Sequence, residues 1–154
     1  MTERDMVERV VHFNKEVLHI SQRSPAPLSD NEHKITMKCL LEEVDEYEEE
    51  YFMYRRDDEA LNHDVEAQYL SHMIDAMIDN IYFAIGAMYK MGLTEDQIRR
   101  CFNAVDDCNV QKKLGKNAKR DTGAADAVKP EGWIGPEQKI LKIILERTNE
   151  NDSN

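Results

Sequence analysis

The sequence predicts an all-α protein, and three features of its composition point to that class. Only 6 of its 154 residues are Gly and 4 are Pro, too few turn residues for the many short strands of a β sandwich. Long stretches are rich in Glu, Lys, Leu and Ala, which favour helices. With 41% hydrophobic and 33% charged residues, the chain has the balance of a soluble globular protein. We expect a four-helix-bundle-like core with an extended basic C-terminal loop and a short terminal helix.

The first predicted helix covers residues 3–18, where apolar residues recur at helical spacing. A second helix is expected to follow Ser29, because Ser29 and Glu32 have the spacing of a capping box. This helix runs from residue 30 to about residue 55. Its predicted apolar stripe consists of Met37, Leu40, Leu41, Val44, Tyr47, Tyr51 and Tyr54.

A third helix is expected over residues 65–91, with Gly92 as a left-handed terminator. Residues 73–89 of this helix contain only two charged side chains, Asp75 and Asp79. Most of the helix circumference must therefore pack against some other surface. Because one short domain cannot cover so many apolar sides, we expect a homodimer or a homotetramer.

A fourth helix is predicted to begin after Thr94, with Gln97 completing a second capping box, and to end near Gly115. The stretch from there to Pro136 has several helix breakers and no sustained period, so it is predicted to be a loop. Pro136 suits the first turn of a short amphipathic helix that follows it.

The chain is expected to form a single domain over residues 1–148, with a polar tail at 149–154 that frays. Three cysteines without a CxxC pair indicate reduced thiols. The N-terminal residues contain no apolar signal segment, and the longest uncharged apolar stretch, residues 80–89, is too short to cross a bilayer. These features predict a cytoplasmic protein with no membrane partner.

The distribution of charge limits the classes of ligand. The formal net charge is −11, which argues against binding to nucleic acid because a phosphate backbone would be repelled. Residues 112–129 nevertheless contain six cations and two anions, a net charge of +4, so the rest of the chain carries −15. An acidic body with one cationic segment suits a ligand that is both anionic and metal-bound.

The acidic residues of the second and third predicted helices form two groups that could face each other. On a helical wheel Glu43, Glu46 and Glu50 occupy one narrow arc at the edge of the apolar stripe, and Asp75 and Asp79 share a line. Mg²⁺ prefers carboxylate oxygens and water, so these acids are suited to a divalent-cation site. The alternatives are ordinary solvated faces and, for the aspartates, salt bridges to basic residues.

Four segments of the chain together resemble a known family: LLEEVDEYEEEY, DAMIDNIYFAIGAMYKMGL, NVQKKLGKNAKR and DAVKPEGW. Over residues 28–136 the sequence is similar to the all-α nucleoside triphosphate pyrophosphohydrolase superfamily, in its MazG-like and phosphoribosyl-ATP pyrophosphohydrolase-like branch. The EExxE element of the family matches Glu42, Glu43 and Glu46, and the second acidic element matches the helix with Asp79. Many members have ExxD there, whereas this chain has DxxxD, with Asp75 as the nearest acid.

The resemblance implies an enzyme that hydrolyses a nucleoside triphosphate to the monophosphate and pyrophosphate. It implies Mg²⁺, with Mn²⁺ as a substitute, held by Glu43, Glu46, Asp75 and Asp79. Glu42 or Glu46 is the candidate catalytic base that accepts a proton from water. Because the sequence is similar to MazZ-like members, which act on purine deoxynucleotides, dGTP is a first substrate to test. Phosphoribosyl-ATP, dUTP and dCTP remain alternatives, and so does a non-catalytic helical interaction module.

The basic segment supplies candidate substrate-binding residues. By resemblance, Asn109 and Lys112 meet the phosphates of the substrate. Clustering in an acidic chain makes Lys119, Arg120 and Lys129 further candidates. The single tryptophan, Trp133, is expected either to cover a base or to anchor the loop. Surface solubility is the alternative role for each lysine and arginine.

Overall fold

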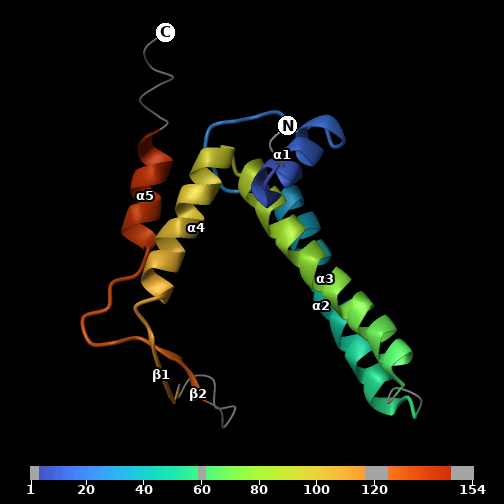
Figure 1. Cartoon of the computed structure of the whole chain (residues 1–154). Coiled ribbons are helices and arrows are strands. Elements are labelled where there is room, and N and C mark those ends of the chain that lie inside the picture. Colours follow the sequence, from blue (N-terminus) through green and yellow to red (C-terminus); the bar gives the residue numbers. More distant parts are fainter. Residues whose placement is uncertain (1–3, 59–61, 117–124, 147–154) are drawn as a thin grey trace. The chain divides into compact units, whose positions relative to one another are not determined.

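A computed structural model describes residues 4–58, 62–116 and 125–146 and confirms the all-α class (Figure 1). The chain divides into two compact units, residues 1–93 and residues 94–154. The first unit contains α1 (Met6–Glu16), α2 (Asp30–Arg56) and α3 (His63–Lys90). The second contains α4 (Glu95–Asn109), strands β1 (Lys113–Lys116) and β2 (Ala125–Val128), and α5 (Glu137–Glu146). No helix in the described ranges is long and apolar enough to cross a membrane.

The start of α2 is set by the predicted capping box. The Glu32 backbone N–H donates to Ser29 Oγ at 3.3 Å, and the Ser29 backbone N–H donates to Glu32 Oε2 at 2.8 Å. The Ser29 backbone N–H and the Ser29 hydroxyl both donate to the Glu32 carboxylate and lower its pKa, with a smaller contribution from Arg23. A sequence signal of four residues therefore places the beginning of a helix of 27 residues.

The helix α2 lies side by side with α3 (Figure 1) and faces it with an unexpected set of side chains. None of its residues is fully buried, and the half-buried ones recur every three or four residues. They include Leu40, Glu43, Tyr47, Glu50 and Tyr54. Only part of the predicted stripe faces α3, because Met37, Leu41, Val44 and Tyr51 are 40–54% exposed in the single chain. The contact seam runs along the edge of that stripe and includes two glutamates.

The helix α1 packs against the C-terminal half of α3 and forms the tightest part of the first unit. Val10 and Val11 have no exposed surface, and Asn14 is 3% exposed. The ring of Phe13 meets that of Tyr82 edge to face, with 5.5 Å between centroids. This arrangement differs from the seam between α2 and α3, where polar side chains are frequent.

Gly92 ends α3 as predicted, and the segment before α2 crosses directly over it. Its φ of 95° lies in the left-handed region, and an added Cβ would lie 2.5 Å from the carbonyl oxygen of Ser24. Gln22 Nε2 donates to the Gly92 carbonyl at 2.9 Å, and the Ala26 N–H donates to the Met91 carbonyl at 2.9 Å. Only glycine fits both the backbone conformation and this close approach.

The second unit corrects two predictions made from the sequence. Thr94 and Gln97 form the expected capping box, but α4 ends at Asn109 and not near Gly115. The predicted loop contains an antiparallel pair of strands, in which Lys113 pairs with Val128 and Lys116 with Ala125. The strands pair residues far apart in sequence, so local periodicity could not reveal them. The predicted terminal helix is confirmed as α5.

Candidate functional site

The predicted carboxylate site centres on Glu43, at the seam between α2 and α3. Glu43 and Asp79 are half-buried, whereas Glu42, Glu46 and Asp75 are exposed. Burial raises the pKa of the Glu43 carboxyl most. The negative charges of Glu46, Asp79, Asp75 and Glu42 raise it further, in that order. The two helices therefore bring acids from both predicted groups within electrostatic range of one carboxyl group.

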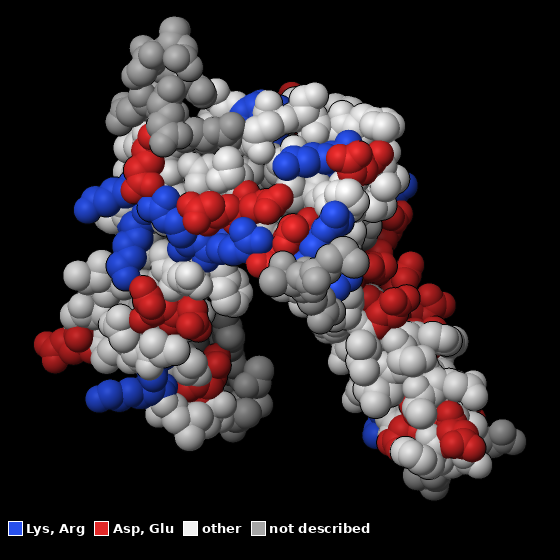
Figure 2. All heavy atoms as spheres, turned by 45° about the horizontal axis from the view of Figure 1, so that its top comes forward, with Lys and Arg blue, Asp and Glu red and all other residues white. Residues whose placement is uncertain are grey.

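Positive side chains do not neutralise this group within the part of the chain that the structure describes. Glu43, Glu46, Asp75 and Asp79 form no ion pair with a described lysine, arginine or histidine. Glu42 pairs with Lys38 one turn earlier on α2, at 3.5 Å, and both side chains are more than half exposed. Figure 2 shows acidic side chains along the helix pair. Among the described residues the acids are thus held near one another without a compensating cation.

The carboxylates do not form a finished metal cage. Among the described residues, no group of three or more His, Cys, Asp or Glu side chains is arranged to hold a metal ion. Like charges in a medium of reduced dielectric repel one another, and side chains on exposed helix faces can rotate to separate them. The donor set nevertheless fits a hard divalent ion, because it consists only of carboxylate oxygens on two neighbouring helices.

Glu50 continues the same seam one turn beyond Glu46, and it has a histidine beside it. Its Oε2 atom is buried and lies 3.1 Å from Nδ1 of His72 on α3. Farther along, Tyr54 donates to Glu66 at 3.2 Å, and Tyr69 donates to Asp57 at 2.8 Å. These polar contacts join the ends of α2 and α3 that lie away from α1.

The second unit gathers several of the predicted substrate-binding residues around its tryptophan. Lys129 Nζ lies 4.2 Å from the ring centroid of Trp133, and Lys112 Nζ lies 5.6 Å from it. Lys112 Nζ also donates to Asn109 Oδ1 at 2.7 Å. The indole Nε1 of Trp133 donates to the Cys108 carbonyl at 2.8 Å, which anchors the ring to the end of α4. Two ammonium groups on one ring are suited to an anion.

Two predicted substrate-binding residues lie outside the described part of the chain. These are Lys119 and Arg120, which follow β1 in the sequence. The structure therefore supports a smaller cationic group, formed by Lys112 and Lys129 with Trp133.

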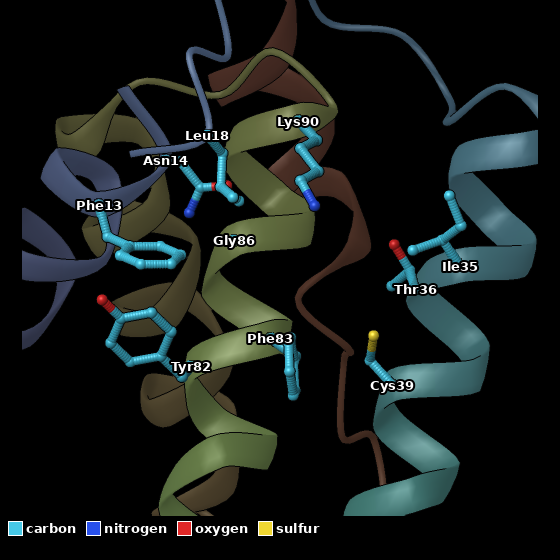
Figure 3. Close-up of a pocket in the computed structure, with 10 residues that line it drawn as sticks. All are labelled: Phe13, Asn14, Leu18, Ile35, Thr36, Cys39, Tyr82, Phe83, Gly86 and Lys90. Atoms are coloured by element: carbon cyan, nitrogen blue, oxygen red, sulfur yellow. The ribbon is translucent and has the colours of Figure 1, made fainter. Parts of the chain in front are cut away.

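Sequence reasoning missed a pocket in the first unit, which is drawn in Figure 3. It encloses about 400 Å³ of empty space, part of it open to solvent, and lies where α1, α2 and α3 meet. Aromatic and small residues dominate its lining. The lining residues are Phe13, Asn14, Leu18, Ile35, Thr36, Cys39, Tyr82, Phe83, Gly86 and Lys90. No local motif marks them, because they come from three separate helices and from the turn after α1.

No protein-family model matches the chain, and no curated protein matches it significantly.

Proposed function

We propose that the protein is a Mg²⁺-dependent nucleoside triphosphate pyrophosphohydrolase, with dGTP as the first substrate to test. The observation that carries the proposal is the position of Glu43. Its carboxyl group is half-buried between α2 and α3, surrounded by the charges of four other acids, and has no described cation paired with it. Such a group is destabilised when ionised, and a divalent cation would relieve the repulsion.

The proposed roles follow from the chemistry of the side chains. Glu43, Glu46, Asp75 and Asp79 would hold Mg²⁺, which when bound offsets the charge of the triphosphate and acidifies water. Water adds across the phosphoanhydride bond between the α- and β-phosphates, and pyrophosphate leaves. The proton of the water passes to a carboxylate. Glu46 is the favoured base, because Glu42 is already paired with Lys38.

The cationic group of the second unit is a separate observation that supports phosphate binding. In a chain with a net charge of −11, Lys112 and Lys129 are held over the same indole ring. We propose that they bind phosphate oxygens and that Asn109 orients Lys112 through the hydrogen bond to its ammonium group. Trp133 supports the two lysines by its position beneath both ammonium groups.

A homodimer or homotetramer is part of the proposal. Apolar side chains on the outer surfaces of α2 and α3 are 40–54% exposed, and Leu41, Ile74 and Ile78 are examples. A surface of this kind is normally covered by another protein surface. A second copy of the chain presents the same apolar faces and can cover both helices.

The decisive experiment compares carboxylate variants in a pyrophosphate-release assay. Purified protein is incubated with Mg²⁺ and separate solutions of dGTP, dATP, dCTP, dUTP and phosphoribosyl-ATP. Glu46→Gln and Asp79→Asn should each reduce kcat/KM by about 100-fold or more, because each removes a charge from the metal group. Glu49→Gln is the matched control, because Glu49 is an exposed acid on α2.

Two outcomes would contradict the proposal. Activity that survives in both variants would remove the carboxylates from the reaction. An inactive wild-type protein that also binds no Mg²⁺ would favour the rival function, a helical interaction module.

A further inference from the structure

We infer that Glu50 and His72 are a positioning pair, which fixes the register of α2 along α3 and so holds the metal-binding carboxylates opposite one another. This inference rests on the proposed function and adds two residues to the machinery of its site. Both residues act through the carboxylates and not on the substrate. The evidence is one contact across the seam, the burial of one oxygen atom and the spacing of the acids on the two helices.

The contact joins a mostly buried carboxylate to a more exposed imidazole. Glu50 Oε2 lies 3.1 Å from Nδ1 of His72, and the two side chains are 21% and 63% exposed. The Oε2 atom itself is buried, and it has no hydrogen-bond partner elsewhere in the described part of the chain. A carboxylate oxygen that is removed from water needs a donor, and the imidazole N–H at this distance supplies one. The buried end of Glu50 therefore depends on a side chain of α3.

The position of this contact determines which residues of the two helices face each other. The helices run antiparallel (Figure 1), so a step toward the N-terminus of α2 matches a step toward the C-terminus of α3. Seven residues make nearly two turns and return to the same helix face. Glu43 is seven residues before Glu50, and Asp79 is seven residues after His72. The register of the contact thus places Glu43 across the seam from Asp79.

The other two proposed ligands lie between these two layers. Glu46 is four residues before Glu50, and Asp75 is three residues after His72, so each is about one helical turn from the contact. Sliding one helix by a single residue would move Glu46 along the axis relative to Asp75 by about 1.5 Å. Mg²⁺ accepts oxygen ligands only near about 2.0–2.1 Å, in a nearly ideal octahedron. A contact that fixes the register therefore decides whether the acids can share an ion.

Apolar packing between the helices defines this register only weakly. No residue of α2 is fully buried among those that the structure describes. A polar contact specifies position more sharply, because its direction and distance are lost when the helices slide. Tyr54 makes a second polar contact across the seam, to Glu66 at 3.2 Å, but both groups are exposed. Water can replace that bond, whereas the buried Glu50 oxygen would lose its donor.

Titration with Mg²⁺ by calorimetry tests the pair without any hydrolysis. Mg²⁺ is the probe because it takes oxygen ligands, so direct binding by the imidazole does not enter the result. His72→Ala and Glu50→Ala should each weaken Mg²⁺ binding about tenfold or more, as the loss of outer-shell partners does at metal sites. The double variant should bind no more weakly than the weaker single variant, because both residues act through one contact.

The His72 variants separate position from charge. A protonated imidazole repels Mg²⁺ and a neutral one has no charge to attract it, so the loss of charge alone would leave binding unchanged or make it tighter. Weaker binding by His72→Ala therefore reports on position. His72→Gln keeps an N–H donor at the same place on α3 and should bind Mg²⁺ within about threefold of the wild-type protein.

Tyr54→Phe is the matched control, because it removes a polar contact between the same two helices one turn farther from Glu46. It should lower the Tm and keep the wild-type affinity for Mg²⁺. Circular dichroism at the titration temperature checks that each variant is folded. Because the His72 side chain is mostly exposed, His72→Ala keeps the test open even if Glu50→Ala does not fold.

Three results would overturn the inference. They are unchanged or tighter Mg²⁺ binding by His72→Ala, an equal loss of affinity in Tyr54→Phe, and a wild-type protein that binds no Mg²⁺.

The positioning pair and the hydrolytic function can fail separately. If the wild-type protein binds Mg²⁺ and the variants lose affinity as predicted, but no pyrophosphate is released, the hydrolytic function fails and the pair stands. If the wild-type protein releases pyrophosphate and His72→Ala keeps both its Mg²⁺ affinity and its kcat, the pair fails and the hydrolytic function stands.

Discussion

The ammonium group of Lys129 lies 4.2 Å from the ring centroid of Trp133. Because Trp133 is the only tryptophan of the chain, its fluorescence reports on the surroundings of this lysine. A phosphate that binds Lys129 would move the ammonium group relative to the ring. The same reasoning applies to Lys112, at 5.6 Å from the ring centroid.

We predict that inorganic tripolyphosphate changes the emission of Trp133 in a saturable way. Lys112→Ala and Lys129→Ala should each weaken this binding about three- to tenfold, because each removes one charged hydrogen-bond donor at a solvent-exposed site. Lys113→Ala is the control, since Lys113 is an exposed lysine of β1 in the same unit. A response that is the same in all three variants would exclude the two lysines as phosphate ligands.

Magnesium is predicted to stabilise the first unit through Glu43. A ligand that binds only the folded state adds roughly 2.7 kcal/mol at 100 times its dissociation constant. MgCl₂ should therefore raise the Tm of the wild-type protein, measured by circular dichroism at constant ionic strength. Glu43→Gln should lose most of this rise, while Glu49→Gln on the exposed surface of α2 should keep it. An equal rise in both variants would indicate a nonspecific effect of the ion.

The contact between α4 and α5 is predicted to depend on pH through Glu146. Arg100 contacts both oxygens of this carboxylate, at 2.7 and 3.0 Å, and lowers its pKa. The bond therefore contributes stability above the unfolded pKa of about 4.5, and the contribution is lost as pH falls through the lowered value. Because both side chains are exposed, the effect should be small and should weaken in high salt.

The measurement for Glu146 is urea unfolding at pH 7 and at pH 3, followed by circular dichroism. The wild-type protein should be more stable than Glu146→Gln at pH 7, and the difference should shrink at pH 3 and in 1 M NaCl. Glu137→Gln in the first turn of α5 controls for the loss of a surface charge. A difference that does not change with pH would mean that packing, and not the ion pair, stabilises the contact.

The outer apolar surface of α2 and α3 is predicted to bind a second copy of the chain. Ile78 is 52% exposed, and complete burial of such a side chain is worth about 1.5–3 kcal/mol. Ile78→Glu should shift the protein toward the 17.9 kDa monomer in sedimentation equilibrium. Ile134→Glu, in the second unit, is a control at an equally apolar exposed position. A wild-type protein that sediments as a monomer at all concentrations tested would contradict this prediction.

Local signals in the sequence predicted most of the fold. The capping residues Ser29 and Thr94 and the terminator Gly92 lie where the sequence placed them, because each acts through contacts within a few residues. The end of α4 was misplaced because Lys113 pairs with Val128. The residue pattern of a four-residue strand is too short to indicate which distant segment it pairs with. Helix boundaries set by local hydrogen bonds can thus be read from the chain, and boundaries set by distant partners cannot.

The candidate site was predictable only in part, for a similar reason. The helical wheel placed Glu43 beside an apolar stripe, but it could not tell which edge of that stripe faces α3. Asn14 gave no signal because an asparagine in a helix is usually a surface residue. Its burial depends on Gly86, which lies against it and is 72 positions away in the sequence.

The absence of any fully buried residue in α2, among those the structure describes, has a consequence for how the acids work together. Because so much of α2 is left uncovered within one chain, we expect the spacing between Glu43 and Asp79 to depend on what covers the outer side of α2. Whatever encloses the outer side of α2 would then set that spacing. Turnover per molecule should accordingly fall when the protein is diluted below the concentration at which its subunits associate.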